Sequence, residues 1–361
     1  MMTWRKYPGN PVIAAPPQGM EIAGFRDPSV WREADEWFLA IGSGIKEQGG
    51  MVLLYRSRDL IHWDYLHLLC KGRRDELLPG KDPVRTGEMW ECPDFFPLAD
   101  KHALIVSTQG AVIYSVGRYV NQYFHPEVQG KVDLGDSYYA ARSMADEKGR
   151  RILWGWIREG RSDAAQRAAG WAGVMSIPRV LTLGQDGRLG MAPALEIGAL
   201  RGKHQRFEAL PIVPGSSSPL KSVRGDSLEI QAEFDPGASE AVGLTVRSAP
   251  EGKEQTSITY NRTSGHLRVE RERSSLSPDV DRRSQGGPFT LAADETLKLH
   301  FFLDASVIEI FADNRACLTS RIYPSRSDSL GIGMFARGGQ ARLKALDVWE
   351  MRPISSNRLT T

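Results

Sequence analysis

Cysteine is scarce in this chain of 361 residues, which contains only Cys70, Cys92 and Cys317. Three cysteines this far apart are too few for a disulfide framework, and no Cys-x-x-Cys or His-Glu-x-x-His string marks a zinc site. We therefore expect the cysteines to be reduced or simply buried, and the sequence offers no metal-binding motif.

An excess of one charge is also missing. Lysine and arginine total 46 against 44 aspartates and glutamates, which leaves a formal net charge of +2. A nucleic-acid-binding protein presents a basic surface to the phosphate backbone, and this balance does not provide one. A neutral or weakly polar ligand fits the composition better, so we expect no nucleic-acid partner.

Long apolar runs are absent as well. No window approaches the ~20 apolar residues of a membrane-spanning helix, and the opening residues 1–6 do not lead into the apolar core of a signal peptide. The sequence as it stands therefore predicts a soluble, cytoplasmic protein with no membrane partner. A segment lost from the amino end could have carried an export signal.

Short apolar and aromatic runs, separated by glycine, proline, aspartate and asparagine, dominate the first 200 residues. They occur at residues 37–42, 51–55, 103–107 and 151–156. Their length and period are typical of β-strands rather than helices. Equivalent runs recur in clusters of about four, as the four-stranded blades of a β-propeller do. We therefore predict an all-β fold with a propeller domain over residues 1–200.

The pattern changes near residues 194–200, where a short helical stretch is predicted, and we place a domain boundary at about 200–210. Beyond it, residues 228–234 and 297–303 alternate cleanly between apolar and polar side chains. Strands with one buried and one wet face show this alternation in a β-sandwich. We therefore predict a C-terminal β-sandwich domain over residues 210–361.

Two carboxylates stand in similar aromatic surroundings. Asp27 lies within FRDPSVW (residues 25–31) and Glu91 within WECPDFFP (residues 90–97). Two carboxylates are the minimum equipment for cutting a glycosidic bond. These segments resemble the RDP and EC motifs of glycoside hydrolase family 32, the invertases, inulinases and levanases. Other segments resemble family motifs in the same order: DLGDSYYA at 133–140, RILWGW at 151–156, LDASVIEIF at 303–311 and LTSRIYP at 318–324.

The resemblance implies a five-bladed type of propeller followed by a sandwich, and a β-fructosidase that needs no cofactor or metal. Its substrates would be terminal fructosyl linkages of sucrose, inulin or levan, cut by a retaining mechanism. The family also contains fructosyltransferases, and the sequence does not separate the two activities. The oligomeric state is left open.

One family element is missing from the sequence. The nucleophilic aspartate of the family lies in a WMNDPNG-like motif, and no such string occurs here. Residues 4–13 (WRKYPGNPVI) resemble the stretch just before the RDP motif, so we expect a chain truncated at its amino end, with the first blade largely missing and little or no activity. Three accounts stay open: a start codon placed inside a longer gene, a carbohydrate-binding pseudo-enzyme, and a remnant that folds poorly.

The resemblance also assigns roles to the two carboxylates. Glu91 is the expected acid/base, and its apolar neighbours Trp90 and Pro93 are expected to raise its pKa. Asp27 is expected to hold two hydroxyls of the fructosyl ring and to stabilise the transition state rather than attack. Arg26 is either a residue that orients a carboxylate or an ordinary salt bridge between blades.

Further residues have two interpretations each. Asp133 either lies near Glu91 and modulates its proton affinity or caps a turn. Trp154 and Trp156 either form part of a sugar-stacking wall or, as we favour, belong to the core. The Gly42–Gly44 segment is interpreted as a turn without a phosphate-binding context.

Overall fold

A computed structural model describes residues 3–45, 48–72 and 87–355 of the chain, and most of these residues belong to β-strands. The chain divides into two compact units. The first comprises Met1–Lys131, Ala140–Met144 and Thr182–Leu189. The second comprises Val132–Tyr139, Ala145–Leu181 and Gly190–Thr361. Within the described residues, no helix combines the length and the apolar character needed to span a bilayer.

The first sheet of the first unit is a four-stranded antiparallel meander. Its strands follow the chain in the order β1 (Ile22–Glu33), β2 (Glu36–Ile45), β3 (Gly49–Ser57) and β4 (Asp64–Lys71). Both faces of the central strands are buried, which is why residues 37–42 and 51–55 read as nearly continuous apolar runs. Gly42 and Gly44 lie inside β2, so the prediction of a turn there is wrong.

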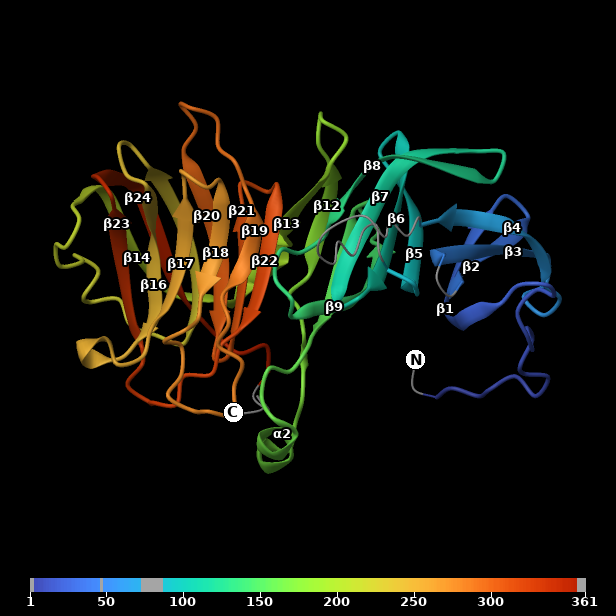
Figure 1. The fold of residues 1–361 in the computed structure, drawn as a ribbon, viewed down its shortest axis with the longest axis horizontal. Helices are drawn as coiled ribbons and strands as arrows, with labels where there is room; N and C mark the ends of the chain where they lie inside the picture. Colours follow the sequence, from blue (N-terminus) through green and yellow to red (C-terminus); the bar gives the residue numbers. More distant parts are fainter. Residues whose placement is uncertain (1–2, 46–47, 73–86, 356–361) are drawn as a thin grey trace. The chain divides into compact units, whose positions relative to one another are not determined.

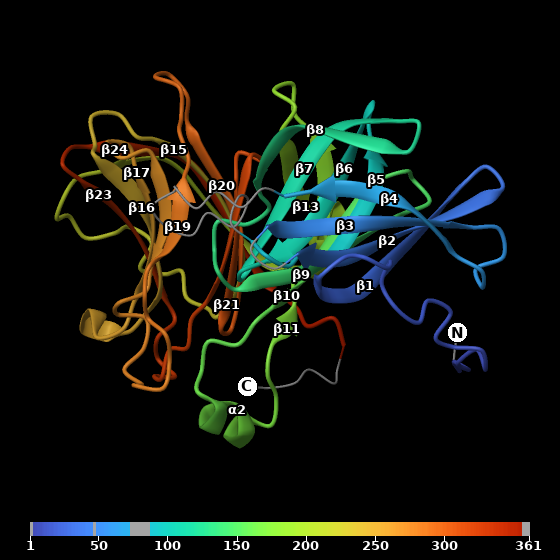
Figure 2. The same cartoon turned by 45° about the vertical axis from the view of Figure 1, so that its right-hand side comes forward.

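The second sheet has the same plan. It consists of β5 (Glu91–Leu98), β6 (Lys101–Thr108), β7 (Ala111–Val120) and β8 (Tyr123–Lys131) (Figure 2). One apolar cluster joins the two sheets, with Phe38 and Leu54 from the first and Phe95 and Leu104 from the second. The Trp31 ring lies 5.8 Å from Phe38 and 5.3 Å from Phe95, centre to centre. This packing holds β1 against β5, the strands that carry the two predicted carboxylates.

The third sheet also follows the chain closely. It contains β9 (Tyr138–Ala145), β10 (Arg151–Ile157), β11 (Val174–Met175), β12 (Arg179–Leu183) and β13 (Leu189–Pro193), with β10 pairing β9, β11 and β12. A short helix, α2 (Asp163–Ala169), lies between β10 and β11. The side chain of Ser162 caps its first turn, and Gly170 ends it in the left-handed conformation.

The second unit contains a two-sheet sandwich (Figure 1). A 3-10 helix, Leu195–Leu200, stands before it, where the sequence predicts a helical stretch. The six-stranded sheet has the order β14 (Arg201–Ile212), β24 (Ala341–Met351), β15 (Ser227–Asp235), β20 (Leu297–Asp304), β21 (Val307–Ala312), β22 (Ala316–Arg321). The five-stranded sheet has the order β19 (Gln285–Pro288), β18 (His266–Glu270), β17 (Thr256–Asn261), β16 (Ala241–Ser248), β23 (Gly331–Arg337).

The core of the sandwich comes from the inward residues of both sheets. Ile230 and Phe301 of the six-stranded sheet and Leu244 and Ile258 of the five-stranded sheet are fully buried in one cluster. Alternate residues of β20 are buried along its first half, residues 297–300, as expected for strands with one wet face. The strands predicted at 228–234 and 297–303 are thus confirmed.

Candidate active site

A β-bulge places Asp27 at the edge of the first sheet. The pairing of β1 with β2 shifts register between Arg26 and Ser29, so Asp27 and Pro28 stand outside the regular ladder. Proline cannot donate to a ladder, and bulges are the positions within sheets that tolerate it. Asp27 also has a positive φ of 60°. A bulge of this kind turns the aspartate out of the alternation that the rest of β1 follows.

The second sheet has a similar β-bulge next to Glu91. The pairing of β5 with β6 shifts register between Glu91 and Asp94, and Cys92 has a φ of 50° just before Pro93. A non-glycine residue in the left-handed region costs on the order of 1–3 kcal/mol, and such residues cluster at functional sites. Two X-Pro bulges in the first strands of neighbouring sheets therefore mark this region of the first unit.

The two bulges are joined through Arg26. Its Nη2 donates to Glu91 Oε1 at 2.7 Å and its Nε to the same oxygen at 3.2 Å. The same Nε lies 4.0 Å from Asp27 Oδ2. Because one nitrogen is this close to both carboxylates, the distance between Asp27 Oδ2 and Glu91 Oε1 cannot exceed the sum of 3.2 and 4.0 Å. Asp27 and Glu91 thus lie close together, and their use of one sugar subsite stays a prediction.

Cys92 holds the Asp27 carboxylate from the side of β5. Its backbone N–H donates to Asp27 Oδ2 at 3.1 Å, and its Sγ lies 3.5 Å from the same oxygen. Burial, assisted by the negative charge of Asp27, raises the pKa of the Cys92 thiol to about 11, so the thiol stays protonated and can donate. The side chains of Asp27 and Glu91 remain 32% and 28% exposed, which leaves both accessible to a ligand.

The guanidinium of Arg142 anchors both bulges, and the sequence interpretation missed it. Its Nη1 donates to the backbone carbonyl of Pro93 at 2.5 Å, and its Nη2 to that of Asp27 at 2.9 Å. Bulges leave carbonyls without ladder partners, and one arginine satisfies a carbonyl of each. The adjacent Ser143 donates through its N–H and its hydroxyl to the buried Asp94, at 2.8 and 2.5 Å.

Gly42 allows the close approach of the two sheets. A Cβ at this position would lie 2.4 Å from the carbonyl oxygen of Trp90 and 3.3 Å from that of Arg26. Any side chain would therefore push the segment before Glu91 away from β2. The requirement for glycine comes from this contact of β2 with Trp90.

Asp133 belongs to a buried ion-pair network of the second unit. Its carboxylate accepts from Arg179 Nη1 at 2.9 Å, from the N–H and hydroxyl of Thr319 at 2.7 Å each, and from the N–H of Gly135 at 2.9 Å. Arg179 also donates to Glu309 at 2.9 Å, and burial raises the pKa of that carboxyl. The contact with Gly135 agrees with the turn-capping interpretation, and the modulation of Glu91 stays a prediction.

The two tryptophans of β10 differ in exposure. Trp154 is half-buried, whereas Trp156 is 44% exposed. The interpretation of Trp156 as a core residue is therefore wrong, and sugar stacking by either ring stays a prediction. No group of three or more histidine, cysteine, aspartate or glutamate side chains able to hold a metal occurs in the described parts of the chain.

Family models match nearly the whole chain. The model of the glycosyl hydrolases family 32 N-terminal domain matches residues 1–193, and that of the family 32 C-terminal region matches residues 196–350. The chain belongs to glycosyl hydrolase family 32. The family predicted from the two carboxylate motifs is thereby confirmed, as is the fold class, a β-propeller followed by a β-sandwich.

Individual family 32 proteins are similar over most of the chain. Sucrose-6-phosphate hydrolase of Zymomonas mobilis subsp. mobilis is 32% identical over 92% of this chain and 67% of its own length. Levanase of Bacillus subtilis is 31% identical over 98% of this chain and 55% of its own length. The crystal structure of fructan 1-exohydrolase IIa from Cichorium intybus matches with a TM-score of 0.84 at 26% identity, over 97% of this chain and 75% of that chain. The chain thus spans between about half and three quarters of these proteins.

Proposed function

We propose that this chain supplies the fructosyl-binding and acid/base part of a β-fructosidase that hydrolyses terminal β-fructofuranosyl linkages. The observation that carries the proposal is the single contact cluster of Asp27, Arg26 and Glu91 at two facing bulges. The names of the similar proteins, a sucrose-6-phosphate hydrolase and a levanase, support sucrose, its phosphate ester or fructans as substrates.

Glu91 is the group to protonate the leaving oxygen and then to activate water. The positive charge of Arg26 favours the ionised carboxylate, which is the form that takes a proton from water in the second step of a retaining mechanism. Apolar neighbours act in the opposite direction and favour the acid form needed in the first step. The alternation between these two forms is the proposed role of the Arg26–Glu91 pair.

Asp27 is the group to bind ring hydroxyls and to stabilise the oxocarbenium-like transition state. Among the described residues, the hydrogen bonds given to its carboxylate fall on Oδ2. The other oxygen is thereby left to accept from the sugar, while Cys92 and Arg142 keep the aspartate in its strained backbone conformation. A fixed carboxylate next to developing positive charge stabilises it without reorganisation.

The nucleophile of this mechanism has no counterpart motif in these 361 residues. We therefore propose that the chain by itself binds fructosyl groups but turns them over poorly. A binding pseudo-enzyme is the second candidate, favoured by the same missing motif. A fructosyltransferase shares every feature described and differs only in the acceptor.

The propeller and sandwich are proposed to divide near residues 200–210, with residues 1–200 and 210–361 as the two domains. The change from one family model to the other falls a few residues earlier, between residues 193 and 196, and β14 of the sandwich begins at Arg201.

The test measures the binding of 1-kestose to the 361-residue chain by calorimetry. Asp27→Asn should weaken binding at least tenfold, because a charged acceptor is lost. The matched control is Asp59→Asn, on an exposed carboxylate of the same unit that bonds to His62. Equal affinities of the chain and the Asp27→Asn variant would refute the proposed site.

A further inference from the structure

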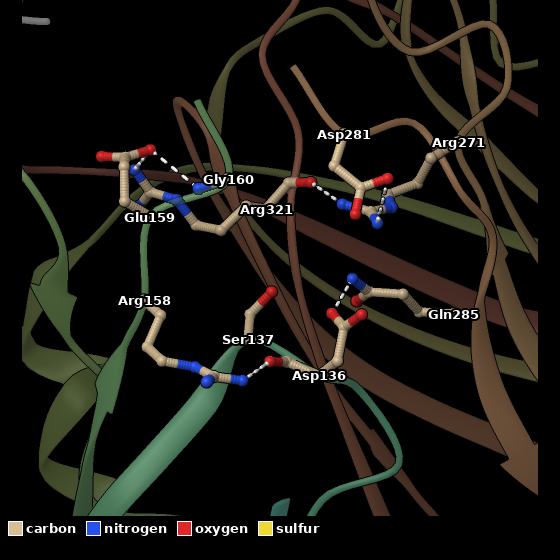
Figure 3. A pocket seen from close by; sticks show the side chains of 9 residues that line it. All are labelled: Asp136, Ser137, Arg158, Glu159, Gly160, Arg271, Asp281, Gln285 and Arg321. Atoms are coloured by element: carbon tan, nitrogen blue, oxygen red, sulfur yellow. Dashed lines mark hydrogen bonds and ion pairs between the residues drawn. The ribbon is translucent and has the colours of Figure 1, made fainter. Parts of the chain in front are cut away.

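A second, strongly charged pocket lies within the second unit, outside the site described above. It has a volume of about 210 Å³ and is formed by the segments before β9, after β10, after β18, before β19 and at the end of β22 (Figure 3). Its lining residues are polar or charged, and none is aromatic: Asp136, Ser137, Arg158, Glu159, Gly160, Arg271, Asp281, Gln285 and Arg321.

Two of the arginines are buried yet incompletely bonded. Arg271 and Arg321 are each only 1% exposed. Arg271 uses Nε and Nη1 to bond backbone carbonyls, both at 2.8 Å, and Arg321 uses Nε to bond the Tyr323 hydroxyl at 2.6 Å. Among the described residues, Nη2 of Arg271 and both terminal nitrogens of Arg321 have no hydrogen-bond partner. Buried donors without acceptors are costly, so these three nitrogens call for an acceptor in the pocket.

The carboxylates that line the pocket form hydrogen bonds with other groups, and only long ion pairs with Arg271 and Arg321. Asp281 binds Arg283 Nη2 at 2.6 Å but lies 4.0 Å from Arg271, and Glu159 binds Arg161 at 2.7 Å but lies 3.5 Å from Arg321. The third lining carboxylate, Asp136, accepts from the Gln285 amide, as Figure 3 shows.

The lining groups and their direct partners therefore carry a surplus of positive charge. Even with Arg158 set aside, four arginines stand against three carboxylates: Arg161, Arg271, Arg283 and Arg321 against Asp136, Glu159 and Asp281. Burial lowers the pKa of Arg271, as it does for a cation whose charge is not fully compensated. A neutral ligand would leave this charge uncompensated, and a sugar ring would find no aromatic face on which to stack.

We propose that this pocket binds a small oxyanion of the phosphate class, held by the terminal nitrogens of Arg271 and Arg321. Guanidinium groups match phosphate oxygens through paired N–H donors, and the pocket volume admits one such group. Inorganic phosphate and the phosphate group of a phosphorylated sugar share this chemistry. The site goes beyond the proposed function, because it lies in the second unit and uses none of the catalytic residues.

The experiment is titration of the 361-residue chain with inorganic phosphate, fructose 6-phosphate and fructose. Binding is measured by calorimetry and by the shift of the melting temperature. Phosphate should bind and raise the melting temperature, and added salt should weaken the binding. Tighter binding of fructose 6-phosphate than of phosphate would assign the site to a sugar phosphate, and equal binding would assign it to the free anion. Binding of fructose with no effect of phosphate would overturn the proposal.

Two variants with opposite expected effects keep the test independent of folding defects. Arg271→Gln should weaken phosphate binding at least tenfold, because it removes a charge-assisted donor. Asp136→Asn should tighten binding a few-fold, because it removes a negative charge from an exposed position and keeps the oxygen that accepts from Gln285. Arg206→Gln, at an exposed arginine paired with Asp347, is the matched control and should change nothing. If Asp136→Asn folds normally but leaves phosphate affinity unchanged or weaker, the anion assignment fails.

Discussion

The guanidinium of Arg26 binds Glu91 Oε1 at 2.7 Å, although the two residues are 65 positions apart and stand on different sheets. The carboxylate of the neighbouring Asp27 accepts a hydrogen bond from the backbone N–H of Cys92, on the second sheet. Each bulge thus contributes one link to the other, and the two predicted carboxylates are positioned as a pair rather than separately.

Arg26→Ala should lower the turnover of a catalytically complete form of the enzyme by about 10–100-fold, the effect of losing a hydrogen bond to a charged group. The guanidinium orients Glu91 without taking part in bond breaking, so kcat should fall more than KM rises. Arg26→Lys should recover part of the loss, since it keeps the charge but not the two-nitrogen contact. The quantities to measure are kcat and KM for sucrose.

The control for Arg26 is Arg58→Ala, at an exposed arginine that forms a 3.4 Å ion pair with Glu36 in the same sheet. Surface pairs of this kind contribute little, so kcat should not change. Full activity of Arg26→Ala would mean that Arg26 is an ordinary salt bridge, the other interpretation that the sequence allows.

Arg142→Gln should destabilise the protein by about 2 kcal/mol, because the carbonyls of Asp27 and Pro93 lose a charged donor. Sugar binding should weaken as well, since the two bulges lose the group that bonds both. Denaturant unfolding and 1-kestose titration measure the two effects. Arg118→Gln, at an exposed arginine paired with Glu127, is the matched control. Weakened binding without any loss of stability would contradict an anchoring role.

Much of this arrangement follows from local sequence, and part of it does not. The strands at residues 51–55 and 103–107 are confirmed, because burial of both sheet faces produces short apolar runs that period and length reveal. The helix at residues 163–169 was missed, although Ser162 and Gly170 are ordinary cap residues, because the sequence interpretation followed apolar periodicity and this helix buries no residue.

The site shows the same division. Asp27 and Glu91 could be identified because each lies in a recognisable motif with proline and aromatic neighbours. Arg142 could not, because it acts on backbone carbonyls of residues 115 and 49 positions away, and such contacts leave no local pattern. The ion-pair network of Asp133, Arg179 and Glu309 could not be predicted for the same reason. These residues are far apart in the sequence and come together only in the folded chain.

Glu254 gives a prediction for stability against pH. This buried carboxylate accepts from Ser325, Ser329 and the backbone N–H of Leu276. Burial acts to raise its pKa, but these hydrogen bonds outweigh it and lower the pKa to about 2. A carboxyl whose pKa is lowered by folding stabilises the fold at every pH above its pKa in the unfolded chain. This contribution is lost as the pH falls through its pKa in the folded protein.

Glu254→Gln should therefore cost about 1–3 kcal/mol of unfolding free energy at neutral pH. The difference from the parent chain should shrink as the pH falls from the ordinary glutamate value of 4.5 toward 2. Urea unfolding at several pH values measures it. Glu251→Gln, at an exposed glutamate of the adjoining turn, is the control and should show no such trend. A constant difference across this range would mean that Glu254 is already protonated in the folded protein.

Fructose release tests the chemistry as a whole. Because no aspartate stands in a nucleophile motif, the 361-residue chain should release little or no fructose from sucrose or inulin, even where it binds them. Loss of a covalent catalyst typically lowers rates by several orders of magnitude. A chain lengthened at its amino end by a segment that carries the nucleophile motif should hydrolyse both substrates.

In that lengthened chain, Glu91→Ala should abolish most of the activity, because the leaving oxygen and the attacking water both lose their proton-transfer group. Glu36→Ala, at a partly buried glutamate of the same sheet as Asp27 that pairs only with surface arginines in the described structure, should leave activity unchanged. The decisive comparison is with the chain of 361 residues. Robust turnover by that purified chain, lost on Glu91→Ala, would show that another carboxylate attacks the sugar, and Asp27 at its exposed bulge would be the first residue to test for that role.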